Sequence, residues 1–202
     1  RACCQSMRPG FRGRETRLWI RVRPDLLRHC GAAILFACWL MLAHGGARSA
    51  GLPVPYRAIV VQPTGLPTQA EFDLRPAIDQ ARREKKSLYI YLGADDCPYC
   101  RRYEAFLAQN AGELLPHFAG YLIVDLRSSL KISSKALIIR TNLGALPYAE
   151  FQRTIGDERA RLLVYPSVWL LDTEVKPLMQ MPAGTGTFQT VPEQLEILNL
   201  VQ

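Results

Sequence analysis

The sequence predicts an α/β fold in which a central mixed β-sheet is flanked by helices. Two short apolar runs, residues 88–92 and 121–126, are separated by a segment with helical patterning, and a third apolar run covers residues 162–172. Short continuous apolar runs are typical of strands that are covered on both faces. A helical crossover between two consecutive strands makes them parallel neighbours. We therefore expect the first two strands to be parallel neighbours in the sheet.

A helix is predicted ahead of the first strand, over residues 74–86. Asp73 stands in the N-cap position, and Pro76 falls in the first turn, where its missing N–H costs nothing. The cluster of basic residues at its end suits the helix dipole and is typical of a solvated helix terminus. Residues 51–69 contain four prolines and predict an extended linker. The folded domain is therefore expected over residues 70–202.

The pattern after the second strand predicts a helical insertion, residues 127–161, before the third strand. A turn at residues 172–174 and an edge strand over residues 175–181 are expected next. Thr190 and Glu193 form a capping-box pattern that predicts the start of a C-terminal helix. We found no internal repeat.

The basic charge of the chain lies in its first 50 residues. Nine arginines and two acidic residues give this segment a net charge of +7, whereas residues 51–202 hold sixteen basic and sixteen acidic side chains. A positive charge confined to one terminal segment is no indication of a nucleic-acid-binding surface on the domain.

This N-terminal segment resembles an export signal. Arginines up to Arg28 precede an uncharged apolar run, residues 31–43, and small residues follow at 45–50. This order is typical of a cleavable secretory signal. The run is shorter than the ~20 residues of a membrane-spanning helix, although an uncleaved anchor remains the alternative. We therefore expect residues 1–50 to be a signal peptide, the protein to be periplasmic, and membrane contact to be limited to the signal segment.

Export makes the distribution of cysteines informative. Four of the six cysteines lie within the signal segment, so that the exported product keeps Cys97 and Cys100. Two cysteines so close in sequence close too short a loop to be an effective structural staple in an oxidising compartment. The pair is therefore expected to carry chemistry.

The first predicted strand is followed by a helix, and the motif at this junction is Cys97-Pro98-Tyr99-Cys100. The positive end of the helix dipole favours a thiolate over a thiol, and a thiolate is the reactive form of cysteine. Two intervening residues bring both sulfurs within reach of one disulfide or one metal ion. The motif predicts a redox-active pair.

This motif and the order of elements resemble the thioredoxin superfamily, over roughly residue 72 to the C-terminus. A second family feature is Pro166 directly before the third strand, in the sequence Val164-Tyr165-Pro166-Ser167. The resemblance implies a thioredoxin fold in which Pro166 has a cis peptide bond and lies beside the cysteines. It also implies that Tyr165 offers backbone contacts to a substrate chain and that Pro166 shapes the groove. The Pro98-Tyr99 interior looks similar to glutaredoxins and periplasmic Dsb-type proteins.

The activity implied by the resemblance is thiol–disulfide exchange with cysteine-containing exported proteins and a redox partner. Cys97, exposed at the helix end, forms a mixed disulfide, and Cys100 resolves it. The expected substrate-binding residues are Pro98, Tyr99, Tyr165 and Pro166. The direction of exchange, whether reduction, oxidation or isomerisation, stays open. The insertion at 127–161 is expected to flank the site and restrict the choice of partner.

Two positions depart from the thioredoxin pattern. Asp96 stands where thioredoxins have a tryptophan, and Tyr91 stands where they have a buried acid. The sequence therefore identifies no proton acceptor for Cys100. Asp125 is a candidate acceptor, but its place after the second apolar run is more typical of a strand-end turn.

Two other function classes stay open: a non-catalytic binding module that uses the Pro166 groove, and a copper or zinc chaperone. A closed zinc site needs two ligands besides the cysteines, and His117 is the single histidine after residue 50. We therefore expect no metal site, no cofactor and a monomeric protein. No Ser-His-Asp grouping, phosphate loop or paired-carboxylate site stands out.

Overall fold

The structure, a computed structural model, describes residues 51–199 except 67, 158, 160–161 and 180–186. All of these belong to one compact unit, Ser49–Gln202. The expected signal peptide lies outside the described residues, as does the end of the predicted strand 175–181. In the described part of the chain, no helix combines the length and apolarity needed to cross a membrane.

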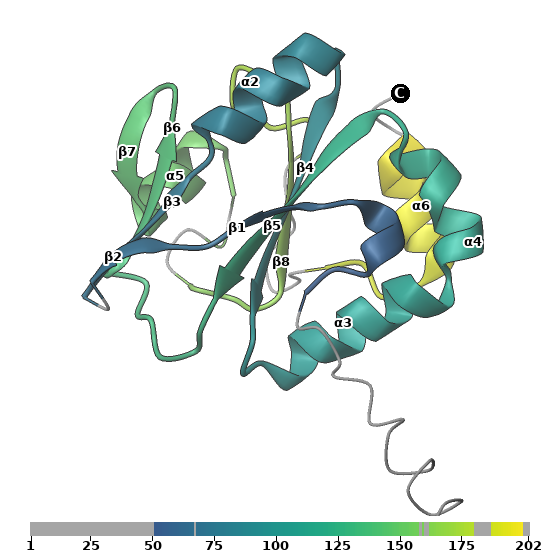
Figure 1. Ribbon diagram of the computed structural model, residues 1–202, viewed down its shortest axis with the longest axis horizontal. Coiled ribbons are helices and arrows are strands. Elements are labelled where there is room, and N and C mark those ends of the chain that lie inside the picture. Colours follow the sequence, from purple (N-terminus) through teal and green to yellow (C-terminus); the bar gives the residue numbers. More distant parts are fainter. Residues whose placement is uncertain (1–50, 67, 158, 160–161, 180–186, 200–202) are drawn as a thin grey trace, which may run out of the picture. The chain divides into compact units, whose positions relative to one another are not determined.

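The unit has a mixed α/β architecture with two four-stranded sheets and flanking helices (Figure 1). The strands of the described part are β1 (Ile59–Val61), β2 (Thr64–Leu66), β3 (Gln69–Asp73), β4 (Ser87–Ala94), β5 (Tyr121–Ser128), β6 (Leu137–Thr141), β7 (Gly144–Pro147) and β8 (Ser167–Leu171). The helices are α2 (Arg75–Glu84), α3 (Pro98–Gln109), α4 (Ala111–Leu114), α5 (Tyr148–Thr154) and α6 (Val191–Asn199), with 3₁₀ turns η1 (Val54–Tyr56) and η2 (Leu115–Phe118).

The first sheet has the strand order β1-β5-β4-β8. β4 and β5 are parallel neighbours, as predicted from the helical crossover between them, and β8 joins β4 antiparallel. The mixed character of the sheet is therefore confirmed. Both β4 and β5 run two residues beyond the predicted apolar runs, so that Gly93 pairs with Arg127 and Ala94 with Ser128.

The second sheet, β2-β3-β6-β7, corrects the predicted helical insertion. Residues 137–147 form two antiparallel strands, and within 127–161 the described helix is α5. Burial alternates along β6, with Leu137, Ile139 and Thr141 facing the core. A period of two and β-branched side chains favour a strand. The expected linker also contributes strands, since β1 is an edge of the first sheet and β2 an edge of the second.

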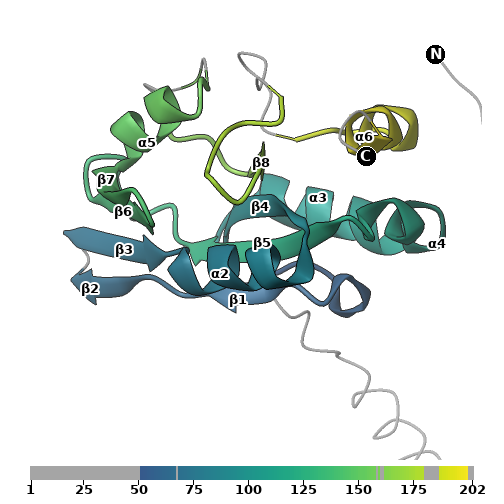
Figure 2. The same ribbon diagram turned by 90° about the horizontal axis from the view of Figure 1, so that it is seen from above.

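The first sheet is covered on both faces, as the unbroken apolar runs predicted. α2 lies on one side of β4 and β5, and α3 lies on the other (Figure 1). Along β4, Leu88, Ile90 and Leu92 belong to one apolar cluster, while Tyr89 and Tyr91 belong to another. The second sheet lies at the opposite end of the unit from α6 (Figure 2).

Local signals in the C-terminal part of the domain have mixed outcomes. The capping box at Thr190 is confirmed: Glu193 Oε2 accepts the Thr190 N–H, and Thr190 Oγ1 accepts the Glu193 N–H. The turn at 172–174 is also confirmed, because Asp172 Oδ1 accepts the Glu174 N–H. The edge strand over 175–181 is wrong in its described part, which forms only an isolated bridge between Leu171 and Pro177.

Candidate functional site

The cysteine pair lies at the junction of β4 and α3, as predicted. Cys97 is the N-cap residue of α3, and its Sγ accepts the Cys100 N–H at 3.1 Å. Pro98 occupies the first helical position, where no hydrogen bond is lost. The Ala94 N–H at the end of β4 donates to Cys100 Sγ at 3.4 Å. Each sulfur therefore accepts one backbone N–H, and both sulfurs lie at the N-terminal, positive end of α3.

Cys97 is not exposed, which corrects the expectation for this residue. Its relative exposure is 2%, and that of Cys100 is 0%. Both cysteines pack with Ala94 and against Tyr165. The Tyr165 hydroxyl hydrogen-bonds to Ser128 Oγ at 2.6 Å, which fixes the phenol ring beside the sulfurs. The sequence did not reveal this contact because Ser128 lies 37 positions earlier in the chain.

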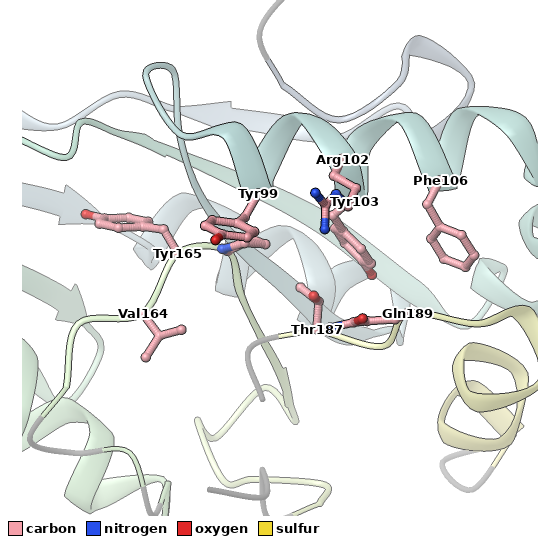
Figure 3. Close-up of a pocket in the computed structure, with 9 residues that line it drawn as sticks. Tyr99, Arg102, Tyr103, Phe106, Val164, Tyr165, Thr187 and Gln189 are labelled. Atoms are coloured by element: carbon pink, nitrogen blue, oxygen red, sulfur yellow. The ribbon is translucent and has the colours of Figure 1, made fainter. Parts of the chain in front are cut away.

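The expected substrate-binding residues lie around this pair. The Tyr165–Pro166 peptide bond is cis, as expected. A pocket of about 300 Å³ opens between α3 and the Tyr165–Pro166 loop (Figure 3). Tyr99, Tyr165 and Pro166 line it, whereas Pro98 is exposed and does not. The remaining lining residues are Arg102, Tyr103, Phe106, Val164, Thr187 and Gln189.

A buried charged cluster lies beneath the cysteine turn. The Arg127 guanidinium, with its side chain 3% exposed, donates to Glu104 at 2.9 Å, to Asp125 at 3.3 Å and to Asp95 at 2.7 Å. Burial lowers the pKa of Arg127, but the three carboxylates outweigh that effect and raise it above its usual value. The guanidinium therefore stays charged and pairs with two buried carboxylates, Glu104 and Asp125, and with the exposed carboxylate of Asp95.

Tyr91 connects this cluster to the cysteines. Its hydroxyl donates to Glu104 Oε1 at 3.0 Å, and it also interacts with the Cys100 thiol. Burial, followed by the charges of Cys100 and Glu104, raises the pKa of Tyr91 above its usual value. Tyr91 therefore remains a neutral hydroxyl that can accept one proton and donate another.

Burial, followed by the hydrogen bond with Cys97, raises the pKa of the Cys100 thiol to about 12. Hydrogen bonds from the Ala94 amide and the Tyr91 hydroxyl oppose this effect. Cys100 is therefore a protonated thiol at neutral pH, and any reaction of its sulfur requires a group that takes up the proton.

Asp125 occupies a different position from the one that its sequence context indicated. It lies inside β5, opposite Tyr91, with a relative exposure of 1%. Burial raises its pKa, against the opposing effects of the Leu52 amide and Arg127. The prediction that Asp125 lies in a strand-end turn is therefore wrong, because β5 continues through Arg127 to Ser128.

Sequence reasoning missed Glu104 and Arg127. Glu104 lies four positions after Cys100 on α3, so that both share one helix face. Arg127 pairs with Gly93 across the sheet, and a Cβ at Gly93 would lie 2.7 Å from Arg127 Nη1. The helical spacing was a usable signal for Glu104. The close approach of Arg127 to Gly93 depends on the register between strands, which the sequence does not specify.

In the described residues, no three His, Cys, Asp or Glu side chains gather in a way that suits a metal ion. The described His117 lies at the other end of α3, in η2, and its Nδ1 is 2.8 Å from Asn199 Oδ1.

Comparisons of the chain with protein-family models, with curated proteins and with solved structures found no match. The class of the protein therefore has to be argued from its fold and its site: a mixed α/β unit with a Cys-x-x-Cys pair at a helix N-terminus, beside a cis-proline loop.

Proposed function

We propose that this chain is an exported thiol–disulfide oxidoreductase of the thioredoxin fold that exchanges disulfides with protein cysteines in the periplasm. The observation that carries the proposal is the placement of Cys97 and Cys100 at the N-terminus of α3, next to a pocket that Tyr165 and Pro166 help to form. A helix N-terminus stabilises a thiolate, and the pocket gives a partner polypeptide a place to bind beside the sulfurs.

The exchange proceeds in two steps. The Cys97 thiolate attacks one sulfur of a partner disulfide, so that a Cys97–partner disulfide forms and the second partner sulfur leaves as a thiolate. Cys100 then attacks Cys97 Sγ. The Cys97–Cys100 disulfide forms, and the partner leaves as a second thiolate. The partner disulfide is reduced and the cysteine pair is oxidised; the reverse sequence donates a disulfide.

The second step requires the loss of the Cys100 proton, and Tyr91 and Glu104 support a route for it. Tyr91 interacts with Cys100, and its O–H donates to Glu104 Oε1. In this route the Cys100 S–H turns to the Tyr91 oxygen. Transfer along this chain leaves a Cys100 thiolate and a protonated Glu104. The Tyr91 hydroxyl then donates to the thiolate. This arrangement takes the place of the buried acid that position 91 lacks.

Access to Cys97 requires a movement, because the sulfur is buried. The loop side chain that packs on the cysteines is Tyr165, and one hydrogen bond to Ser128 holds its hydroxyl. A single such bond contributes about 1 kcal/mol. Rotation of Tyr165 also gives up the packing of its ring on the cysteines and on the apolar core, and an arriving polypeptide replaces that packing beside Cys97.

The test is a trap for the mixed disulfide. With Cys100→Ala, Cys97 is expected to accumulate covalent adducts with cysteine-containing exported proteins, visible as bands on a non-reducing gel that disappear with reductant. Cys97→Ala is the matched control and removes the bands. A Cys100→Ala protein that forms no adduct with any disulfide substrate contradicts the proposal.

The same experiment separates the two alternatives. A non-catalytic binding module retains partners without a covalent bond, so that its complexes survive Cys97→Ala. A copper or zinc chaperone binds a metal ion tightly at equilibrium, which titration of the reduced protein measures. For an oxidoreductase we expect covalent adducts and weak metal binding. Measurement of the Cys97–Cys100 reduction potential then establishes the direction of exchange.

A further inference from the structure

The pocket beside the cysteine pair has two unequal walls. Four side chains of α3 project toward the segment that contains Val164 and toward Thr187 and Gln189 (Figure 3). They are Tyr99, Arg102, Tyr103 and Phe106. Their spacing of three and four positions places them along one helix face. Aromatic rings therefore line most of the helical wall, and the opposite wall is apolar around Val164 and Pro166.

Arg102 is the single charged side chain in this lining. The contact of its guanidinium within the described residues is with the Tyr99 ring, at 5.6 Å from the ring centroid. The acidic side chains of the adjacent turn already have other partners. Asp95 pairs with Arg127, and Asp96 accepts hydrogen bonds from Ser129 and Leu130. The pocket thus presents a positive charge with no carboxylate from the described residues to neutralise it.

Such a lining complements an acidic side chain. A guanidinium binds a carboxylate through charge-assisted, often bidentate, hydrogen bonds. A lysine side chain in the same place would face Arg102 with a like charge. The pocket volume of about 300 Å³ suits one or two side chains of a polypeptide.

We propose, on the basis of the proposed function, that this pocket selects partner proteins in which an acidic residue lies close to the target cysteine. The spacing is set by α3. Arg102 follows Cys97 by five positions, which corresponds to about 7.5 Å along a helix. An extended polypeptide rises about 3.3 Å per residue, and residues two apart point to the same side. For a partner chain that runs extended along α3, the acidic residue lies two positions from the cysteine bonded to Cys97.

The experiment uses Cys100→Ala protein and three peptides that differ at one position. Each peptide carries one cysteine activated as a mixed disulfide with thionitrobenzoate, and the residue two positions away is Glu, Ser or Lys. The Cys97 thiolate attacks the peptide sulfur, the Cys97–peptide disulfide forms, and thionitrobenzoate leaves as a coloured thiolate. The rate of colour release measures the reaction. We expect the Glu peptide to react about tenfold faster than the Lys peptide, with the Ser peptide between them.

Two variants test whether Arg102 causes the preference for the Glu peptide over the Lys peptide. Arg102→Gln is expected to bring the Glu and Lys rates to within twofold of each other. Arg101→Gln is the control, since Arg101 carries the same charge on the same helix and does not line the pocket. It is expected to preserve the ratio of the Glu rate to the Lys rate.

The inference is overturned if the three peptides react at the same rate, or if the preference survives Arg102→Gln. Both of these outcomes leave the proposed function intact, because Cys97 still reacts. If no peptide reacts with Cys97, the proposed function fails and this inference fails with it.

Discussion

In the proposed exchange Glu104 acts through Tyr91, and the consequences of this arrangement can be measured at single residues. Glu104→Gln keeps the size of the side chain but removes the base, and Tyr91→Phe removes the hydroxyl between Glu104 and Cys100. We expect each change to slow the attack of Cys100 on the mixed disulfide by roughly 100-fold at neutral pH, the range for loss of a general base. Stopped-flow release of the second thiolate measures this step.

The pH dependence distinguishes a lost proton acceptor from a structural defect. Because burial raises the Cys100 pKa to about 12, its thiolate is rare at neutral pH. In Glu104→Gln the rate of the second step should therefore rise about tenfold per pH unit, with hydroxide as the base. The first step, attack by Cys97, should keep its rate. Exposed Glu113→Gln is the control, and equal slowing of both steps in Glu104→Gln would contradict the role of Glu104.

At the scale of elements, the proposed function predicts that the loop before β8 controls access to Cys97. Tyr165→Ala removes the ring that packs on the sulfurs, and Tyr165→Phe keeps the ring but loses the hydrogen bond to Ser128. We expect alkylation of Cys97 by iodoacetamide to accelerate about tenfold in Tyr165→Ala and by less in Tyr165→Phe. Mass spectrometry with Cys100→Ala in each background follows the single thiol.

A matched control is available for this prediction. Tyr99 is 63% exposed and belongs to α3, and it does not pack on the cysteines. Tyr99→Ala should therefore leave the alkylation rate nearly unchanged. If Tyr165→Ala reacts no faster than the parent protein, another element covers Cys97 and the gating role of this loop is wrong.

The same loop follows a buried ion pair that holds β8 in place. Asp157 accepts hydrogen bonds from the Arg159 guanidinium and from Trp169 Nε1 in β8. Removal of one partner of a buried pair costs about 3–5 kcal/mol, since it leaves the other charge uncompensated. We therefore expect Asp157→Asn to lower the free energy of unfolding by that amount at pH 7. Urea denaturation measures it.

The effect of pH on this pair has a definite sign. Burial raises the pKa of Asp157, but the hydrogen bonds and charge of Arg159 outweigh it and hold that pKa below its usual value. A lowered carboxyl pKa stabilises the fold above about pH 4 and loses that contribution as the pH falls further. The difference between the parent and Asp157→Asn should therefore shrink at pH 3. Exposed Asp79→Asn should change little at either pH, and a difference independent of pH would contradict an ionised Asp157.

The elements differ in how far the sequence predicts them, for physical reasons. Residues 88–92 and 121–126 are apolar without interruption, and the structure confirms both as strands. Residues 137–147 are more ambiguous, since their apolar cluster is short enough to suit either a helix or a strand. β6 pairs with β3, more than 60 positions earlier, and β7 pairs with β6, so that pairing determines the conformation of both segments. A pattern confined to the segment itself does not contain that information.

For the site, the sequence predicted the residues that the motif contains and missed those that the fold supplies. Cys97 caps a helix because of the local order of Cys97, Pro98 and the residues that follow, so local signals are sufficient. Arg127 and Ser128 reach the site because β5 runs beside β4 in one particular register. The burial of Cys97 likewise depends on Tyr165, which comes from a distant loop.

For the molecule as a whole, Arg127 joins four parts of the unit. Through its three carboxylate partners it connects β5 with the cysteine turn and α3, and Asp125 in turn accepts the Leu52 N–H at 2.8 Å from the first described residues. A native domain is stable by only about 5–15 kcal/mol. Arg127→Met leaves buried carboxylates without a counter-charge and should cost about 3–5 kcal/mol of that stability.

A double-mutant cycle tests whether the cost of Arg127→Met arises from these charges or from lost packing. Glu104→Gln removes one of the uncompensated carboxylates, so that Arg127→Met should be less destabilising in the Glu104→Gln background than alone. Residues in one buried network show coupling energies of about 0.5–3 kcal/mol, and we expect a value in the upper half of this range. Urea denaturation of the four proteins at pH 7 gives the coupling energy. If the two effects are additive, Arg127 stabilises the unit through its packing, and the charged cluster does not link the cysteine turn to the sheet.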